Sequence, residues 1–342
     1  MKHLTLLLIT TYTTLFSAHS CADAQHRQTE PEPTYITSDY INPVFLGNGP
    51  DPSVIRTSGG KFYAYTTASK IFESEDLVNW VQLKKAFNAQ SRPSWLEGGA
   101  VWATDINYIN GRYVLYYALS KWGEQHENGI GVAVASTPEG PFTDQGAMFT
   151  SDGIGVQNSI DPCYYMHEDK HYLAWGSWHG IWLAELDQTA LKVNDSVPLR
   201  QLAGTLFEAP MIHKRGEYYY LFCSIGSCCA GLNSTYQTVV CRSKSLFGPY
   251  VDKEGKPMLQ NNYELVLSKN DAFVGPGHNS ELITDDMGKT WFLYHAFDVK
   301  HPEAQRCIML DEVKWDADGW PYVENNGPSH TLQKGPVFRL LQ

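Results

Sequence analysis

Five short aromatic segments recur along the sequence, and they constrain the fold more than any other feature. They cover residues 61–65, 112–116, 171–175, 217–221 and 290–294. Each follows a turn residue and has the aromatic composition that is typical of strands. No long segment shows apolar residues at helical spacing. Five similar units, each long enough for a four-stranded antiparallel sheet, predict an all-β fold, a five-bladed β-propeller over residues 39–342.

The first 38 residues lie outside this repeat. Lys2 and His3 precede an apolar run over residues 4–16, which is too short to span a bilayer and predicts an export signal over residues 1–20. Small residues then precede Cys21, in a pattern that resembles a bacterial lipoprotein cleavage site and predicts a lipid anchor. Residues 21–38 have no apolar period and predict a tether. We therefore expect an exported bacterial protein that is periplasmic, a cell-surface lipoprotein or secreted.

A polar residue stands ahead of each aromatic segment. These residues are Asp51, Asp105, Asp161, Glu208 and His278. The innermost strands of a propeller begin around one central channel, so the five side chains are expected to meet at its mouth. Asp-Pro and Glu-Ala-Pro are also ordinary turn sequences, but five polar residues in register favour a functional cluster. Carboxyl groups that cluster have shifted pKa values, which is typical of catalytic sites.

Two carboxyl groups that face each other across a channel can hydrolyse a glycosidic bond. One protonates the leaving oxygen, and the other acts on the opposite face of the sugar ring. Blades one and four face each other in a five-fold ring, so Asp51 and Glu208 are the predicted pair. Asp161 beside Glu208 would raise the pKa of Glu208 by like-charge repulsion and keep it protonated near neutral pH.

Charge and aromatic content favour a carbohydrate partner over nucleic acid. The net charge of −11 disfavours binding to a phosphate backbone. The chain has 10 Trp, 20 Tyr and 14 Phe, and flat rings stack on sugars as well as packing in β-sheet cores. Trp102 is predicted to be a sugar platform at the channel mouth, with core packing as the alternative. Asp105 is predicted either to bind substrate or to hold the start of its strand.

The ordered motifs resemble those of glycoside hydrolase family 43. They are Asp51-Pro52-Ser53, Trp102-Ala103-Thr104-Asp105, Ser159-Ile160-Asp161-Pro162, Glu208-Ala209-Pro210 and Gly275-Pro276-Gly277-His278. The resemblance covers nearly all of the chain after the tether and implies an inverting enzyme. It implies that Asp51 is the general base, Glu208 the general acid and Asp161 the modulator of the acid's pKa.

Similarity to arabinan-active members of this family implies a metal ion. A hydrated cation such as calcium is expected in the central channel, with His278 as its ligand. The alternative is an ordinary histidine beside a Gly-rich turn. No organic cofactor is expected.

Residues 226–236 resemble a loop that borders the substrate groove in arabinanases and arabinofuranosidases. The resemblance implies that the substrate is α-1,5-linked L-arabinan, a plant cell-wall polysaccharide, or its oligosaccharides, cleaved by endo- or exo-action. It places Cys228 and Cys229 at the substrate; alternatively they are structural, as a vicinal disulfide or as buried thiols. A β-xylosidase that acts on xylo-oligosaccharides and a non-catalytic glycan-binding propeller are the competing functions.

Overall fold

The structure, a computed structural model, describes residues 33–341, and its compact body begins at Thr34. The predicted export signal, Cys21 and most of the predicted tether lie outside the described residues. Tyr35 and Ile36, which were placed in the tether by sequence, form strand β1 (Tyr35–Ile36) and pair with β25 (Phe338–Arg339). The folded body therefore begins before residue 39, because this segment has a strand partner near the C-terminus.

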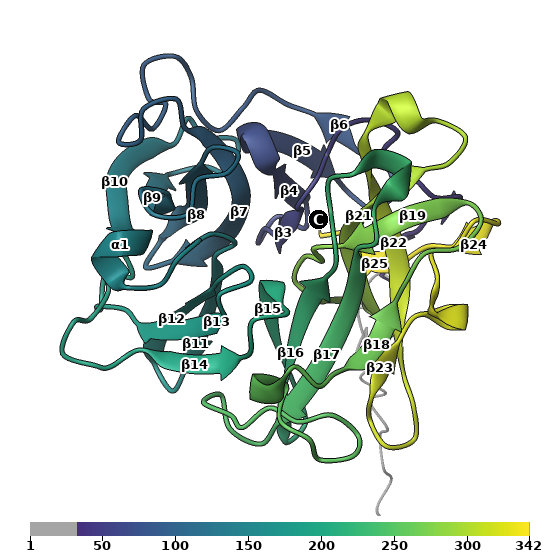
Figure 1. Cartoon of the computed structure of the whole chain (residues 1–342). Helices are drawn as coiled ribbons and strands as arrows, with labels where there is room; N and C mark the ends of the chain where they lie inside the picture. Colours follow the sequence, from purple (N-terminus) through teal and green to yellow (C-terminus); the bar gives the residue numbers. More distant parts are fainter. Residues whose placement is uncertain (1–32, 342) are drawn as a thin grey trace, which may run out of the picture. The chain divides into compact units, whose positions relative to one another are not determined.

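Five antiparallel sheets follow one another along the chain and surround a common centre (Figure 1). The five-bladed propeller that the aromatic repeat predicted is therefore confirmed. In chain order the blades consist of β3 (Ser53–Arg56), β4 (Phe62–Thr66), β5 (Lys70–Ser74) and β6 (Val81–Gln82); β7 (Ala100–Ile109), β8 (Arg112–Ser120), β9 (Gly129–Ala135) and β10 (Thr143–Thr150); β11 (Cys163–His167), β12 (Lys170–Trp175), β13 (Ile181–Glu185) and β14 (Arg200–Ala203); β15 (Glu208–Arg215), β16 (Tyr218–Ile225), β17 (Gln237–Ser243) and β18 (Glu264–Leu267); and β19 (Phe273–Gly277), β20 (Ile283–Thr284), β21 (Thr290–Asp298), β22 (Arg306–Trp315) and β23 (Pro321–Tyr322).

Other regular elements are short. Strand β2 (Asp39–Tyr40) pairs with β24 (Gln333–Lys334). Among the described residues the helical segments are α1 (Ser151–Ile154) and the 3₁₀ turns η1 (Thr67–Ser69), η2 (Gly231–Asn233), η3 (Met258–Gln260), η4 (Pro302–Ala304) and η5 (Glu324–Asn326). Within residues 33–341, no helix has the length and apolar character needed to cross a membrane.

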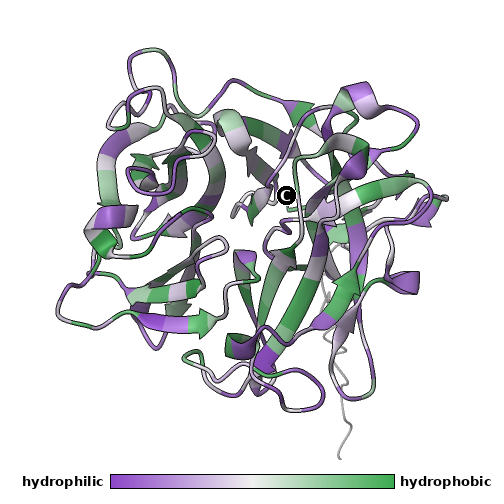
Figure 2. Cartoon of the chain, viewed as in Figure 1, coloured by the Kyte–Doolittle hydropathy of each residue, from purple (hydrophilic) through white to green (hydrophobic). Residues whose placement is uncertain are grey.

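The aromatic segments form the second strand of each blade, where they pack the blades against one another. In β4, Tyr63 and Tyr65 contact the core shared with the second blade, whereas Phe62 and Ala64 contact the core shared with the fifth. Successive side chains of a strand point to opposite faces, so a strand buried on both faces needs a continuous apolar run. Figure 2 shows that the strands are largely hydrophobic and the loops largely hydrophilic. The repeated rings thus serve packing rather than sugar binding.

A ring of hydrogen bonds holds the first strands of the blades around the centre. Each bond runs from a backbone N–H at or beside a first strand to a side chain of a neighbouring blade. The bonds are Ile106 N to Ser53 Oγ at 2.9 Å, Tyr164 N to Asp105 Oδ2 at 2.7 Å, Ala209 N to Asp161 Oδ2 at 3.2 Å, His278 N to Ser224 Oγ at 2.8 Å and Val54 N to Glu281 Oε2 at 2.7 Å. The ring satisfies buried donors and fixes the positions of the residues that begin these strands.

Candidate active site

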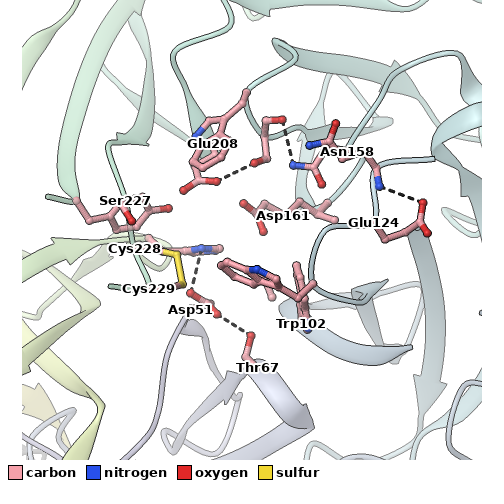
Figure 3. Close-up of a pocket in the computed structure, with 18 of the residues that line it drawn as sticks. Asp51, Thr67, Trp102, Glu124, Asn158, Asp161, Glu208, Ser227, Cys228 and Cys229 are labelled. Carbon is pink, nitrogen blue, oxygen red and sulfur yellow. Dashed lines mark hydrogen bonds and ion pairs between the residues drawn. A yellow bond between two sulfur atoms is a disulfide. The ribbon is translucent and has the colours of Figure 1, made fainter. Parts of the chain in front are cut away.

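A cavity of about 500 Å³ opens where the first strands begin. Seven of the eight site residues predicted from sequence line it, and the eighth, Asp105, does not. The seven are Asp51, Trp102, Asp161, Glu208, Cys228, Cys229 and His278. Figure 3 shows that the carboxyl groups of Asp51, Asp161 and Glu208 converge on this cavity from three sides. Residues from all five blades, remote in sequence, therefore share one site.

The backbone adopts a left-handed conformation at the residues that approach the cavity. The φ angle is 59° at Asp51, 60° at Asp161, 53° at Ala209 and 49° at His278. A residue other than glycine in this region costs about 1 kcal/mol or more. Four blades have such a residue beside the cavity: Asp51 and Asp161 precede β3 and β11, Ala209 lies within β15, and His278 follows β19. The strain therefore belongs to the channel mouth, where the chain changes direction.

Asp51 is a buried carboxylate held by positive and hydrogen-bonding groups. Thr67 Oγ1 donates to Asp51 Oδ2 at 2.6 Å, and Arg306 Nη1 lies 3.0 Å from Oδ1. Burial alone would raise the pKa of Asp51, but Arg306, followed by His278 and His295, outweighs burial and holds this pKa well below its usual range. Asp51 is therefore charged near neutral pH, as a general base requires.

The pKa of Glu208 is raised, whereas that of Asp51 is lowered. Ser177 Oγ donates to Glu208 Oε2 at 2.7 Å, and Tyr236 lines the same cavity. Burial raises the pKa of Glu208 to about 6, assisted by the charge of Asp51 and opposed by the bonds from Ser177 and Tyr236. A carboxyl group with this pKa is half protonated at about pH 6 and still protonated in about a tenth of the molecules at pH 7, far more than an ordinary glutamic acid, which suits a general acid.

Asp161 lies beside Glu208 and shares its titration. The Asp161 carboxyl accepts a bond from Ala209 N, the residue after Glu208, at 3.2 Å. Burial raises the pKa of Asp161 well above its usual range, and the charges of Glu208 and Asp51 raise it further. The two neighbouring carboxyl groups therefore keep at least one proton as a pair near neutral pH. Burial, rather than the like-charge repulsion inferred from sequence, is the larger cause for both groups.

Three tryptophans line the cavity, and two of them were missed by sequence. Trp102 is half-buried, Trp122 is 82% exposed and Trp178 is 50% exposed. Exposed rings beside a cavity are suited to stacking on sugar faces. Trp122 and Trp178 closely follow β8 and β12, the second strands of their blades. In an antiparallel hairpin the second strand ends where the first begins. A Trp shortly after the second and third aromatic segments was therefore the sequence signal that could have placed these two rings at the cavity.

Cys228 and Cys229 form a vicinal disulfide, and both line the cavity. The structure therefore has the vicinal disulfide of the structural alternative, and it places this disulfide on the cavity. The loop that carries them is closed at its base, because Thr235 N donates to Ser227 O at 3.0 Å and Ser227 N to Thr235 Oγ1 at 3.1 Å. The other cysteines of the described chain, Cys163, Cys223, Cys241 and Cys307, are buried free thiols.

His278 lines the cavity, with its Nδ1 3.4 Å from Asp51 Oδ1. Over residues 33–341, no group of three or more His, Cys, Asp or Glu side chains is arranged to hold a metal ion. Arg306 already offsets the charge of Asp51. These residues do not form a calcium site built of protein ligands. They fit only a cation that keeps most of its water and takes His278 as its single protein donor.

Asp105 holds the start of its neighbour's strand. The Asp105 carboxyl accepts bonds from Tyr164 N at 2.7 Å and from Asn107 Nδ2 at 2.8 Å. Burial raises the pKa of Asp105 well above its usual range, and the Glu281 carboxyl beside it adds to this effect. Asp105 does not line the cavity, and the backbone that its carboxyl group holds is that of β11 in the next blade.

Comparisons with known proteins agree with this geometry. The model of the family described as Glycosyl hydrolases family 43 matches residues 40–321. An extracellular endo-α-(1→5)-L-arabinanase of Bacillus subtilis is 34% identical over 79% of this chain and 86% of its own. An extracellular exo-α-(1→5)-L-arabinofuranosidase of Cellvibrio japonicus is 33% identical, over 80% and 86%. The solved Cellvibrio cellulosa α-L-arabinanase complexed with arabinohexaose has a TM-score of 0.74 at 31% identity, covering 81% of this chain and 96% of that one.

Proposed function

The chain belongs to glycosyl hydrolases family 43 and is a glycoside hydrolase, and on that premise we propose that it cleaves α-1,5-linked L-arabinan or its oligosaccharides with inversion. The family resemblance, found first in the ordered motifs, supports the reaction class. The printed activities of the relatives, endo-arabinanase and exo-arabinofuranosidase, support the choice of arabinan over xylan.

The observation that carries this proposal is the opposite protonation of two carboxyl groups on one cavity. Asp51 is kept charged by Arg306. Glu208, with a pKa of about 6, keeps its proton to a higher pH than an ordinary glutamic acid. Inverting hydrolysis needs this pair, one group that takes a proton from water and one that gives a proton to the leaving oxygen. A glycan-binding propeller without catalysis has no need for such a pair.

The proposed reaction is a single displacement. Glu208 donates its proton to the glycosidic oxygen while Asp51 removes a proton from a water molecule. That water attacks the anomeric carbon on the face opposite the leaving sugar, and the bond to the leaving oxygen breaks. Thr67 and Arg306 hold the Asp51 carboxylate in place. After release, Glu208 is charged and Asp51 is protonated, and exchange with solvent restores both.

The product spectrum tests the substrate. The purified protein is incubated with linear arabinan, with arabino-oligosaccharides and with xylo-oligosaccharides, and product lengths are followed over time. Release of arabinose or arabino-oligosaccharides, with little action on the xylo-oligosaccharides, supports the proposal. A ladder of early products identifies endo-action, and monomer alone identifies exo-action. Preferential release of xylose would replace arabinan with the β-xylosidase alternative.

The pH profile follows from the two carboxyl groups. Because the acid must be protonated, kcat/KM is expected to fall as pH rises through the Glu208 pKa of about 6. Because the pKa of Asp51 lies well below its usual range, the acidic limb is expected at lower pH than an ordinary carboxyl group gives. Initial rates from pH 3 to 9, with folding checked at each pH, measure both limbs. A rate that keeps rising above pH 8 would contradict the assignment of Glu208.

Trp122 is expected to serve long substrates. Its exposed ring is worth about 1 kcal/mol as a stacking surface, which is roughly a fivefold change in affinity. Trp122→Ala is therefore expected to raise KM for arabinan about fivefold and to leave KM for the shortest cleaved oligosaccharide nearly unchanged. Tyr108→Ala, which removes an exposed ring away from the cavity, is the matched control. Equal effects on long and short substrates would remove this role from Trp122.

We also propose that His278 binds a hydrated cation such as calcium. If the cation is present, EDTA is expected to lower the melting temperature by a few degrees, and added Ca²⁺ to restore it. His278→Ala is expected to abolish this dependence, because it removes the single protein donor. Identical melting curves with EDTA and with Ca²⁺ for the wild-type protein would remove the cation from the account.

Export remains part of the proposal. The relatives from Bacillus subtilis and Cellvibrio japonicus are named as extracellular, which supports an export signal at residues 1–20 and location outside the cytoplasm. The lipid anchor at Cys21 rests on the sequence pattern alone. Cell fractionation of the full chain and of a Cys21→Ala variant distinguishes a membrane-anchored from a released protein.

A further inference from the structure

Two buried rings stand between the base and the acid of the site. Tyr236 and His295 are stacked, with ring centroids 5.6 Å apart and planes 9° from parallel. Tyr236 immediately precedes β17 of the fourth blade, and His295 lies within β21 of the fifth. The reaction proposed above uses neither ring, although each contacts one of the two carboxyl-bearing residues.

His295 holds the backbone of the base. The Asp51 N–H donates to His295 Nδ1 at 3.2 Å, at the residue whose φ angle is 59°. The same Nδ1 lies 3.2 Å from Asp51 Oδ1, so the ring contacts both the backbone and the carboxyl group of the base. Burial lowers the pKa of His295 to about 4, so the ring is neutral in the working range.

Tyr236 contacts the acid from the other side. Tyr236 and Glu208 line the same cavity, and a hydrogen bond from the Tyr236 hydroxyl favours the charged form of Glu208. Burial raises the pKa of Tyr236 well above its usual range, and the charges of Glu208 and Asp161 raise it further. The phenol therefore stays protonated and acts as a hydrogen-bond donor throughout the working pH range.

Glycines of the Gly275-Pro276-Gly277-His278 motif form the seat for this ring. A Cβ atom at Gly277 would lie 2.3 Å from Tyr236 Cδ1, and one at Gly275 would lie 2.7 Å from Ser234 Cβ. Gly277 is also the residue of β19 that pairs with His295 in β21. Only a strand without side chains at these two positions lets the loop before β17 approach so closely. The seat, the Tyr ring and the His ring thus form one packed unit.

We propose that Tyr236 and His295 form a single positioning unit, which holds the Glu208 carboxyl group and the Asp51 backbone at a fixed separation across the cavity. This inference rests on the proposed roles of Glu208 and Asp51. His295 anchors the base through its backbone amide, and the stack carries that anchor to the tyrosine whose hydroxyl restrains the acid. Neither ring exchanges a proton with the substrate, so both are positioning residues.

Removal of the Tyr236 hydroxyl tests the unit at the acid. Tyr236→Phe keeps the ring on its seat and leaves unchanged the other groups that face Glu208, namely Ser177, Asp161, Asp51 and Arg306. We expect kcat on arabinan to fall about tenfold with little change in KM. We also expect the alkaline limb of the pH profile to move to higher pH, because the charged form of Glu208 loses a donor. The matched control is Tyr250→Phe, which deletes a buried hydroxyl bonded to Leu246 O in the same blade.

A double-mutant cycle tests the connection between the rings. His295→Asn keeps an acceptor near the position of Nδ1 but removes the stacked ring, so the Tyr236 hydroxyl loses its lateral support. If the stack positions the Tyr236 hydroxyl, adding Tyr236→Phe to the His295→Asn protein lowers kcat only slightly further. The losses in kcat of Tyr236→Phe and His295→Asn are then expected to combine less than multiplicatively.

The outcomes separate this inference from the proposed function. A wild-type protein that does not cleave arabinan refutes the proposed function. An active wild-type protein whose kcat and alkaline limb are unchanged by Tyr236→Phe overturns the positioning unit alone. Losses that multiply across the cycle also overturn it, since they show that the two rings act independently. Loss of kcat equal to that of the Tyr250→Phe control would assign the effect to general destabilisation and overturn it too.

Discussion

Glu208→Gln is expected to lower kcat on arabinan by about 10² to 10⁴, the range that general acid catalysis contributes. The amide has nearly the same shape as the carboxyl group but cannot deliver a proton to the leaving oxygen. The loss is expected to be much smaller on an arabinoside with a nitrophenol leaving group, because such a group departs without protonation. Glu217→Gln, at an exposed residue outside the cavity, is the control. Equal losses on both substrates would show that Glu208 is not the acid.

The same substitution makes a prediction for stability. The pKa of Glu208 is raised to about 6 in the folded protein, so the folded state favours the protonated form. Folding stability is therefore lost as pH rises through about 6. Glutamine cannot ionise, so Glu208→Gln is expected to match or exceed the wild-type melting temperature at pH 8. Thermal unfolding at pH 5 and pH 8 measures this difference, and a lower melting temperature for the variant at both pH values would contradict it.

Asp51→Asn is expected to lower kcat on arabinan by a similar factor, again about 10² to 10⁴. The asparagine cannot take a proton from the attacking water. Azide, which attacks without deprotonation, is expected to restore part of the turnover and to give an arabinosyl azide of inverted configuration. The azide product is identified by NMR. Near-normal hydrolysis by Asp51→Asn would refute its role as the base.

Unlike the change at Glu208, the change at Asp51 is expected to destabilise the fold. The pKa of Asp51 is depressed in the folded state, so its charged form adds stability above its ordinary pKa, and this contribution is lost as pH falls through the folded pKa. Asp51→Asn leaves the Arg306 guanidinium without its carboxylate partner. Breaking such a buried pair costs about 3 to 5 kcal/mol. Denaturant unfolding at pH 7 is expected to report a loss of this size.

The blades and the carboxyl groups could be predicted from sequence because a propeller converts spacing along the chain into position around an axis. Polar residues at the same position in different repeats, such as Asp51 in the first and Asp161 in the third, must then meet. The aromatic segments were equally informative for a physical reason: a strand buried on both faces needs a continuous apolar run. Which strand of a blade each aromatic segment forms was less predictable. The aromatic segments form the second strands, whereas the polar residues lie at the first strands.

The partners of the carboxyl groups could not be predicted from one sequence. Arg306 begins β22 and pairs with Asp51 across 255 residues, and nothing in its neighbourhood marks it. His295 lies inside a strand that reads as core. Tyr236 follows the cysteine loop, and its ring depends on the register that places Gly277 beneath it. Such contacts are set by the closure of the ring between the first and last blades, which sequence spacing alone does not specify.

The origin of the pKa shifts was also beyond sequence. Adjacent carboxyl groups suggested repulsion, whereas burial is the larger cause at Glu208 and Asp161. Burial depends on how segments from different blades pack around the cavity, which spacing along the chain does not specify.

The configuration of the first-formed sugar tests the central claim most directly. If Asp51 activates water while Glu208 protonates the leaving oxygen, one displacement occurs at the anomeric carbon. Proton NMR during the first minutes of hydrolysis of an α-1,5-linked arabino-oligosaccharide should then detect the β-anomer of the new reducing end before mutarotation. Initial accumulation of the α-anomer would mean a double displacement, and it would contradict the assignment of these two carboxyl groups as base and acid.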